Sequence, residues 1–483
     1  MTPNKQAFIV LPITAVVLMI AVVGFQIPEN NWITVILAVM ATAVLGYLMI
    51  WQKYFLVLLL MALVPFSHDV EIPGIGFAIS LPVELLLVVL SIFLVKPLVW
   101  KRGKWFLSHP MTILLLVDLG WLILTSVTSS DHLVSAKRVF MRCLFLLFGY
   151  FFMLQWFKDK RALLKPFFMY ALGFIPVILV ILNTHSRHGF VSQISFYVTK
   201  PFYDEHTVYA ACLAFIVPIV LYASRRTRLV SKDPGSKLVL ALVFLVFLAA
   251  LVLSYSRAAW LSLIVGMGVY WTLKVRLRPV YYASGVLGVL LFAFIFQGQI
   301  IRTLKGTEAV SNDGDVANHV TSVTNVSTDA SNLERINRWV CAIRMFEAKP
   351  LFGFGPGTYQ FEYAQFQTAE YTTRISTKSG DKGNAHSEYL MALSETGLPG
   401  LLSFLIIVIY TIYLGIRNNL RGEGYLREVN NVLLVSLVTF FFHGIFNSFI
   451  DQDKMALLLY PAIAAIAAIS GHINKEKEEL AAG

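Results

Sequence analysis

Three ionisable residues in the second half of the sequence are of types that handle charged substrates. Arg257 lies in a short polar connection between two apolar runs, Arg335 lies in a long polar segment, and His386 lies near the end of that segment. Guanidinium groups bind phosphate oxygens through paired hydrogen bonds, and an imidazole can take a proton near neutral pH. These residue types therefore favour phosphate binding and proton transfer.

Each of these residues also has a structural interpretation. Arg257 could extend along the membrane surface to the lipid headgroups, but its connection is too short to hold it away from the protein, which favours a function. Arg335 and Arg338 are one helical turn apart. Arg338 can pair with Glu334 on the helix surface, whereas Arg335 has no such neighbour in the sequence. A lone histidine at a helix start, such as His386, is more often a surface residue.

Four further residues are candidates for substrate binding: Arg338, Glu388, Glu395 and His206. The two glutamates could orient His386, although a glutamate in a first helical turn also complements the helix dipole. The histidines expected outside the membrane lack the spacing of metal ligands, and the three cysteines are far apart in the sequence. We therefore expect no metal, no cofactor and no disulfide.

The elements that position these residues should be membrane-spanning helices. Hydrophobic residues make up 57% of the 483 positions and charged residues only 14%, with a mean hydropathy of +0.70. Soluble domains carry about a quarter charged residues, and a membrane span needs roughly 20 apolar residues. We expect an all-α integral membrane protein with about fourteen transmembrane helices. The expected spans are 8–26, 32–50, 54–67, 81–99, 110–128, 139–157, 163–183, 207–223, 237–254, 257–273, 280–297, 398–416, 429–448 and 455–471.

Lysine and arginine are unevenly distributed among the short connections. With the N-terminus inside, most of them fall on the cytoplasmic side, as the positive-inside rule requires. We therefore expect both termini in the cytoplasm and the segment 298–397 in the periplasm. The net charge of +11 reflects this orientation rather than nucleic-acid binding, because the positive residues are scattered in small clusters between spans.

The external segment 298–397 should form one large helical loop. Ser331 to Glu334 has the form of a capping box, and the helix after it should end before Pro350. A second short helix should run from about 385 to 396 and break at Gly397. The first helix should bury an apolar stripe of Ile336, Val340, Ile343, Met345 and Phe346. The chain then divides into 1–297 (spans 1–11), 298–397 (periplasmic loop domain), 398–472 (spans 12–14) and 473–483 (cytoplasmic tail).

Four sequence blocks resemble those of the O-antigen ligase and polymerase superfamily, in the order typical of that family. They are Ser-Arg-Ala-Ala-Trp-Leu at 256–261, Arg-Ile-Asn-Arg-Trp at 335–339, the glycine-rich block at 350–359, and His-Ser-Glu-Tyr-Leu at 386–390 continuing into 395–400. The resemblance covers about 240–415. Ser387 follows the histidine where the family often has asparagine.

This resemblance implies a GT-C-like enzyme that takes a glycan from undecaprenyl diphosphate at the outer face of the bacterial inner membrane. It implies that Arg257, Arg335 and His386 are catalytic. The arginines would stabilise the charge that develops on the leaving diphosphate without a metal, and His386 would orient or deprotonate the acceptor hydroxyl. An in-line attack would invert the anomeric carbon.

Several functions remain open within and beyond this interpretation. The single long loop late in the chain slightly favours a ligase that uses lipid A–core as the acceptor. The alternatives are a repeat-unit polymerase and a protein O-glycosyltransferase. A lipid-linked oligosaccharide flippase is the non-enzymatic alternative, but charged residues within spans are sparse and no internal repeat is visible, both unlike transporters.

Overall fold

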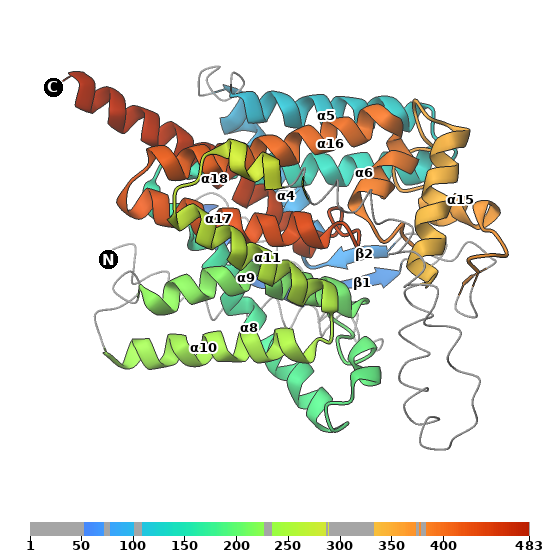
Figure 1. Cartoon of the computed structure of the whole chain (residues 1–483), viewed down its shortest axis with the longest axis horizontal. Coiled ribbons are helices and arrows are strands. Elements are labelled where there is room, and N and C mark those ends of the chain that lie inside the picture. The colour runs from blue at the N-terminus through green and yellow to red at the C-terminus, as the bar shows by residue number, and fades with distance from the viewer. Residues whose placement is uncertain are drawn as a thin grey trace, which may run out of the picture.

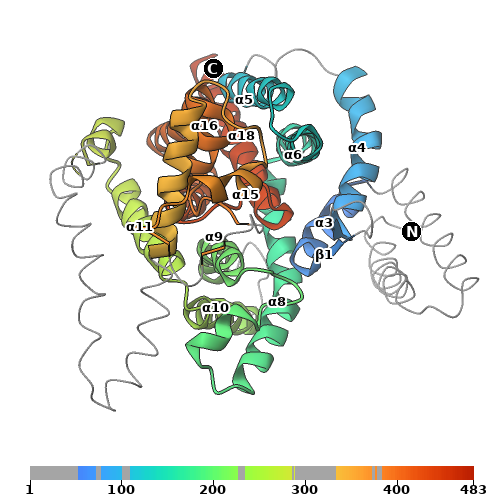
Figure 2. The same ribbon diagram turned by 90° about the vertical axis from the view of Figure 1, so that its right-hand side faces the viewer.

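The computed structural model describes residues 53–71, 78–100, 109–226, 234–285, 288, 333–372, 376–377 and 383–482 of the 483-residue chain. Within these ranges the chain is helical apart from one two-stranded sheet and the connecting segments. The long helices form a bundle, and the segment that carries α15 (Tyr359–Glu362) covers one end of it (Figure 1). Figure 2 looks onto that end.

Most of the helices are apolar and are joined by short connections. In chain order they are α3 (Lys53–Leu63), α4 (Val83–Trp100), α5 (Pro110–Val127), α6 (His132–Phe145), α7 (Met153–Trp156), α8 (Lys165–Ser186), α9 (His206–Arg225), α10 (Pro234–Leu253), α11 (Arg257–Lys274), a helix over residues 333–348, α15, α16 (Glu388–Arg421), α17 (Gly424–His443) and α18 (Asp453–Ala482). A π-helical segment, Leu146–Phe152, joins α6 to α7 in one continuous span.

Seven helices in the described ranges are long and apolar enough to cross a membrane, so the chain is a multi-pass membrane protein. They are Pro110–Val127, His132–Trp156, Lys160–Ser186, His206–Arg225, Glu388–Arg421, Gly424–His443 and Asp453–Ala481. Each overlaps one of the expected spans, although the span expected at 139–157 begins earlier, at His132.

The other expected spans are less complete in the structure. Spans 54–67 and 237–254 form shorter apolar helices, Tyr54–Phe66 and Lys237–Leu253. Spans 81–99 and 257–273 form α4 and α11, which are not among the seven. Spans 8–26 and 32–50 lie outside the described residues, as does most of 280–297. The total of fourteen spans therefore stays a prediction.

Local sequence determines where several helices begin. The His109 ring accepts the N–H of Met111 at the start of α5, where Pro110 occupies the first turn. The Asp131 carboxylate accepts two N–H groups at the start of α6. The Ser387 hydroxyl accepts an N–H in the first turn of α16. Such caps satisfy N–H groups that have no partner inside the helix.

The centre of the bundle is formed by α9 and α18. In each of them 89% of the apolar segment is buried inside the protein, compared with 28% for α5. Helix α17 packs against α9, α11 and α18, and α16 packs against α5. The exposed face of α5 is rich in leucine, isoleucine and valine, as expected for a helix that faces lipid.

The break expected at Gly397 is confirmed. Helix α16 contains a non-helical residue there, with φ of 70° and ψ of −172°. A Cβ atom at this position would lie 2.1 Å from the carbonyl oxygen of Leu351, so only glycine fits both the backbone conformation and the space. The kink separates a short segment, 388–396, from the long apolar part of α16.

The first helix of the loop ends before Pro350, as expected, but it buries a different face. Its buried face consists of Glu334, Asn337, Arg338, Cys341, Ala342 and Met345. Of the expected apolar stripe, Met345 is buried as expected, but Ile343 is 44% exposed, so the stripe is wrong at that position. Polar residues can occupy the inner face because Glu334 and Arg338 neutralise each other there. The first two positions of the expected capping box lie outside the described residues.

A small antiparallel sheet was not expected from the sequence. Strands β1 (His68–Glu71) and β2 (Ala78–Leu81) pair with His68 opposite Leu81 and Glu71 opposite Ala78. Along the chain the sheet comes between α3 and α4, and in the bundle it lies toward the same end as α15 (Figure 1). Four-residue strands are too short to give a clear alternating pattern next to apolar spans.

Candidate functional site

Arg335 lies near both of the other candidate catalytic residues. Burial lowers the pKa of Arg335, the charge of Arg257 lowers it further, and Glu205 acts in the opposite direction. Burial, together with the charges of Arg335 and Arg338, lowers the pKa of His386 to about 3. The fold therefore brings three distant parts of the sequence into electrostatic contact around Arg335.

Arg257 is held at the start of α11 by a tight connection to α10. Tyr255 adopts a left-handed backbone conformation, with φ of 52°, and its hydroxyl donates to the Phe190 carbonyl at 2.8 Å. Trp260 Nε1 donates to the Leu251 carbonyl at 2.8 Å. These contacts fix the backbone, while the Arg257 side chain is exposed and accessible to a substrate.

Arg338 is buried in protein contacts. Its Nε donates to Glu334 Oε1 at 2.9 Å, and both side chains are 8% exposed. Its guanidinium lies 4.4 Å from the centre of the Tyr363 ring, and its backbone carbonyl accepts the Tyr359 hydroxyl at 2.8 Å. Arg338 therefore stabilises the loop, and its charge reaches the site through its effect on His386.

His206, the first residue of α9, belongs to the same surroundings. It lies close enough to Arg335 for the two side chains to interact. Its ring contacts Phe196 edge to face, with centroids 4.2 Å apart. The histidine and Glu205 before it thus bring the start of α9 up to Arg335.

His386 occupies a strained position just before α16. Its φ is 46°, its N–H donates to Asn384 Oδ1 at 2.9 Å, and its carbonyl accepts Trp339 Nε1 at 3.2 Å. Its Nδ1 is buried and has no hydrogen-bond partner in the described part of the chain. With a pKa of about 3, the ring is neutral at pH 7 and can accept a hydrogen bond from a hydroxyl group.

Glu388 holds the connection between α17 and α18 against the start of α16. Its carboxylate accepts the Ser448 hydroxyl at 3.1 Å and the N–H groups of Phe449 and Ile450. Its own N–H donates to the Gly444 carbonyl at 2.8 Å. The carboxylate is therefore engaged in structural hydrogen bonds.

Glu395 has a similar role in the glycine-rich turn. Its carboxylate accepts the N–H of Tyr359 at 3.0 Å, and its carbonyl accepts the N–H of Gly355 at 2.8 Å. The side chain is 5% exposed. Glu395 thus fixes the turn that precedes α15.

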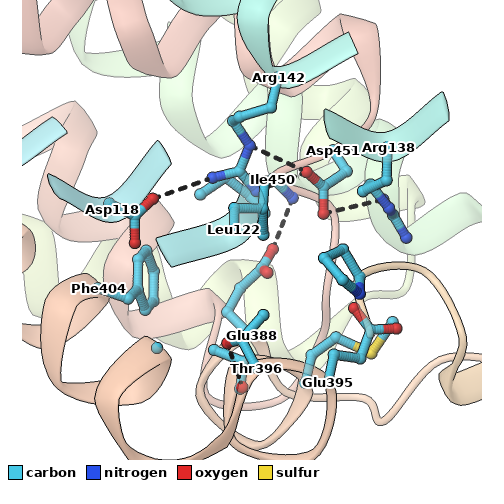
Figure 3. Close-up of a pocket in the computed structure, with 14 residues that line it drawn as sticks. Asp118, Leu122, Arg138, Arg142, Glu388, Glu395, Thr396, Phe404, Ile450 and Asp451 are labelled. Atoms are coloured by element: carbon cyan, nitrogen blue, oxygen red, sulfur yellow. Dashed lines mark hydrogen bonds and ion pairs between the residues drawn. The ribbon is translucent and has the colours of Figure 1, made fainter. Parts of the chain in front are cut away.

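Both glutamates line a cavity of about 50 Å³ (Figure 3). Its charged lining residues are Asp118, Arg138, Arg142, Glu388, Glu395 and Asp451. Arg142 lies between two carboxylates, 2.5 Å from Asp451 and 3.6 Å from Asp118. None of the three candidate catalytic residues lines this cavity. Its ion pairs connect neighbouring helices and are separate from the cluster formed by Arg257, Arg335 and His386.

Sequence analysis missed three polar residues around Arg335 and His386. Burial raises the pKa of Glu205, and the charges of Arg338 and Arg335 oppose that shift. His443 ends α17, and Asn447 follows it; they are 1% and 2% exposed. None of their side-chain nitrogen and oxygen atoms has a hydrogen-bond partner within the described ranges. The signal in the sequence that could have identified His443 and Asn447 was the presence of polar residues at the outer end of the expected span 429–448.

The described residues contain no group of three or more histidine, cysteine, aspartate or glutamate side chains placed to hold a metal ion. Cys143, Cys212 and Cys341 are all free thiols. Among the described residues, the charged groups that act on this site include Arg257, Arg335, Arg338 and the half-buried Glu205. The arrangement can therefore bind an anion and present a neutral imidazole to a hydroxyl group.

Comparison with known families and proteins identifies the part of the chain that carries this cluster. The family model described as O-antigen ligase matches residues 241–405, and no curated protein matches the chain. The matched segment contains Arg257, Arg335 and His386. The resemblance inferred from the four sequence blocks is thus confirmed over residues 241–405, and the chain is a multi-pass membrane protein with an O-antigen ligase domain in that segment, a domain typical of glycosyltransferase-type enzymes.

Proposed function

We propose that the protein transfers a glycan from undecaprenyl diphosphate to lipid A–core at the outer face of the bacterial inner membrane. The proposed reaction inverts the anomeric carbon and requires no metal, and its catalytic residues are Arg257, Arg335 and His386. The match of residues 241–405 to the O-antigen ligase family model supports lipid-linked glycan substrates. The choice of lipid A–core and the catalytic roles belong to the proposal.

The observation that carries the proposal is the proximity of two like charges. Arg257 depresses the pKa of Arg335, which is also lowered by burial. Two guanidinium groups near one another repel unless an anion lies between them. Glu205 supplies a single negative charge whose own ionisation is opposed by burial. A diphosphate has the negative charge and the neighbouring oxygen pairs that planar guanidinium groups bind bidentately.

The proposed step begins when an acceptor hydroxyl attacks the anomeric carbon of the donor sugar. The bond between that carbon and the phosphate oxygen breaks, and its electron pair goes to the leaving diphosphate. Arg257 and Arg335 stabilise the resulting charge. The hydroxyl proton goes to His386, whose basicity rises when the diphosphate places negative charge beside Arg335.

Of the remaining candidate residues, one binds the substrate directly in this proposal and three act by positioning other residues. His206 lies beside Arg335, and we assign it to substrate binding. Arg338, Glu388 and Glu395 influence the substrate through the residues that they hold in position. Their buried hydrogen bonds and ion pair support this assignment.

The proposed topology has fourteen spans, cytoplasmic termini and a periplasmic segment 298–397. The clustering of Arg257, Arg335 and His386 at one end of the bundle supports a site on one membrane face. Reporter fusions at Lys232 and at Asn325 should report opposite compartments. The same compartment for both would contradict this topology.

A reconstituted assay tests the function. Purified protein should join an undecaprenyl-diphosphate-linked glycan to lipid A–core, and Arg335→Ala should reduce the rate at least about 10²-fold. Arg344→Ala is a matched control, because Arg344 is exposed on the same helix and should leave the rate unchanged. Transfer to a second lipid-linked repeat unit, but not to lipid A–core, would identify a polymerase. Equal rates for both variants would refute the proposed site.

A further inference from the structure

Two buried polar side chains next to the candidate catalytic residues are not used by the proposed reaction. His443 is 1% exposed and Asn447 is 2% exposed. Neither ring nitrogen of His443 and neither amide atom of Asn447 has a hydrogen-bond partner among the described residues. Buried polar groups without partners are unfavourable in a folded protein. Four such atoms on one short segment therefore point to a ligand that bonds them.

His443 lies in the electrostatic surroundings of Arg335, and Asn447 lies beside His386. The charge of Arg335 acts on His443 as well as on His386. Asn447 lies beside the His386 ring, close enough to influence it but without the geometry of a formed hydrogen bond. The Phe449 ring packs edge to face on His443, with centroids 5.1 Å apart, which restrains the imidazole.

The backbone holds this segment in place before any substrate binds. Glu388 donates its N–H to Gly444 and accepts the N–H groups of Phe449 and Ile450. These bonds attach residues 444–450 to the start of α16, two residues after His386. His443 and Asn447 are thus preorganised, as groups that bind a substrate must be.

The chemistry of the two side chains suits a sugar better than a phosphate. A neutral imidazole offers one donor and one acceptor, and a carboxamide offers both as well. Sugar hydroxyl groups also donate and accept, whereas phosphate oxygens chiefly accept and are matched by the arginines. We propose that His443 and Asn447 bind hydroxyl groups of the sugar at the reacting centre, beside His386. This inference rests on the proposed glycan transfer.

Shape-conserving substitutions separate this role from a structural one. His443→Phe and Asn447→Leu remove the polar atoms and keep most of the volume. Each should raise the KM of the sugar substrate about tenfold, as expected for a lost buried hydrogen bond. Neither should lower the melting temperature, because no protein hydrogen bond is lost. Asn418→Leu is the control: Asn418 is buried, and its amide donates to the Ile466 carbonyl at 2.9 Å. That variant should melt earlier with unchanged KM.

Two kinetic arms identify the sugar. A rise in the donor KM assigns the pair to the transferred glycan, and a rise in the acceptor KM assigns it to the acceptor. Binding of undecaprenyl diphosphate without a glycan should be unchanged in both variants and weakened by Arg335→Ala. Wild-type KM values for both substrates, or an equal loss of affinity for the glycan-free lipid, would overturn the inference. If the wild-type protein transfers no glycan, the proposed function fails, and the affinities for glycan-bearing and glycan-free lipid still decide the inference.

Discussion

Removing Arg335 or Arg257 should reduce transfer by different amounts, because the two side chains lie in different surroundings. Arg335 is partly buried and Arg257 is exposed. A charge about 4 Å from a phosphate contributes about 4 kcal/mol at an effective dielectric constant of about 20, but only about 1 kcal/mol in water. At about 1.4 kcal/mol per decade, Arg335→Ala should lower kcat/KM about 10³-fold. The exposed Arg257 should contribute an energy between these two limits, about 2 kcal/mol, so Arg257→Ala should lower kcat/KM roughly 30-fold.

The loss of activity in Arg257→Ala should not be accompanied by a loss of stability. Without donor, Arg257 disfavours the charged form of Arg335, so Arg257→Ala should leave the melting temperature unchanged or raise it. Adding undecaprenyl diphosphate should raise the melting temperature of the wild-type protein more than that of Arg257→Ala, because a ligand stabilises the state that binds it. Both quantities can be measured on detergent-purified protein, by steady-state transfer and by thermal unfolding. A wild-type kcat/KM together with a wild-type ligand shift in Arg257→Ala would refute the shared diphosphate site.

Three further predictions concern the metal, the pH profile and the kink. Transfer should continue in EDTA; loss of activity that Mg²⁺ or Mn²⁺ restores would contradict the role given to the arginines. In pH–rate profiles, the decrease of kcat on the acid side should occur at a higher pH than the corresponding decrease of kcat/KM for the donor. The pKa of His386, about 3 in the free protein, keeps its ring neutral, and a bound diphosphate should raise that pKa; coincident acid limbs would argue against His386 as the base. Gly397→Ala should reduce the free energy of unfolding by at least about 2 kcal/mol, seen as a lower melting temperature, because its Cβ would meet the Leu351 carbonyl at 2.1 Å and its φ is 70°. An unchanged melting temperature would count against this reasoning.

The sequence was most informative where a residue type is required by local geometry. Gly397 could be identified as a break because glycine followed by proline ends a helix. The tight hairpin before Arg257 could be located because two apolar runs are separated by a few polar residues. Seven spans could be recognised from length and hydropathy alone. Each of these inferences depends on a short stretch of chain.

The sequence was least informative where burial depends on contacts between distant residues. The helix over 333–348 buries Glu334 and Arg338 rather than Ile343, because the two charges neutralise each other inside the loop. A hydrophobic pattern cannot reveal this, since it counts both residues as polar. His443 and Asn447 were overlooked for a related reason. They follow an apolar run, and only the fold brings them to His386.

In the cluster of Arg257, Arg335 and His386, two positive charges repel each other, and side-chain hydrogen bonds to backbone carbonyls hold the segments that carry them in place. Tyr255 fixes the hairpin that carries Arg257, and Trp339 ties the helix of Arg335 to the His386 carbonyl. These are neutral hydrogen bonds, so the positions of the arginines do not depend on a bound anion. Electrostatic stabilisation of a leaving group is most effective when the stabilising charges need not move as the reaction proceeds. We therefore expect the hairpin, the loop helix and the start of α16 to keep the same arrangement with and without donor. Burial and repulsion would then lower the stability of the empty site, and the binding of a diphosphate would restore it.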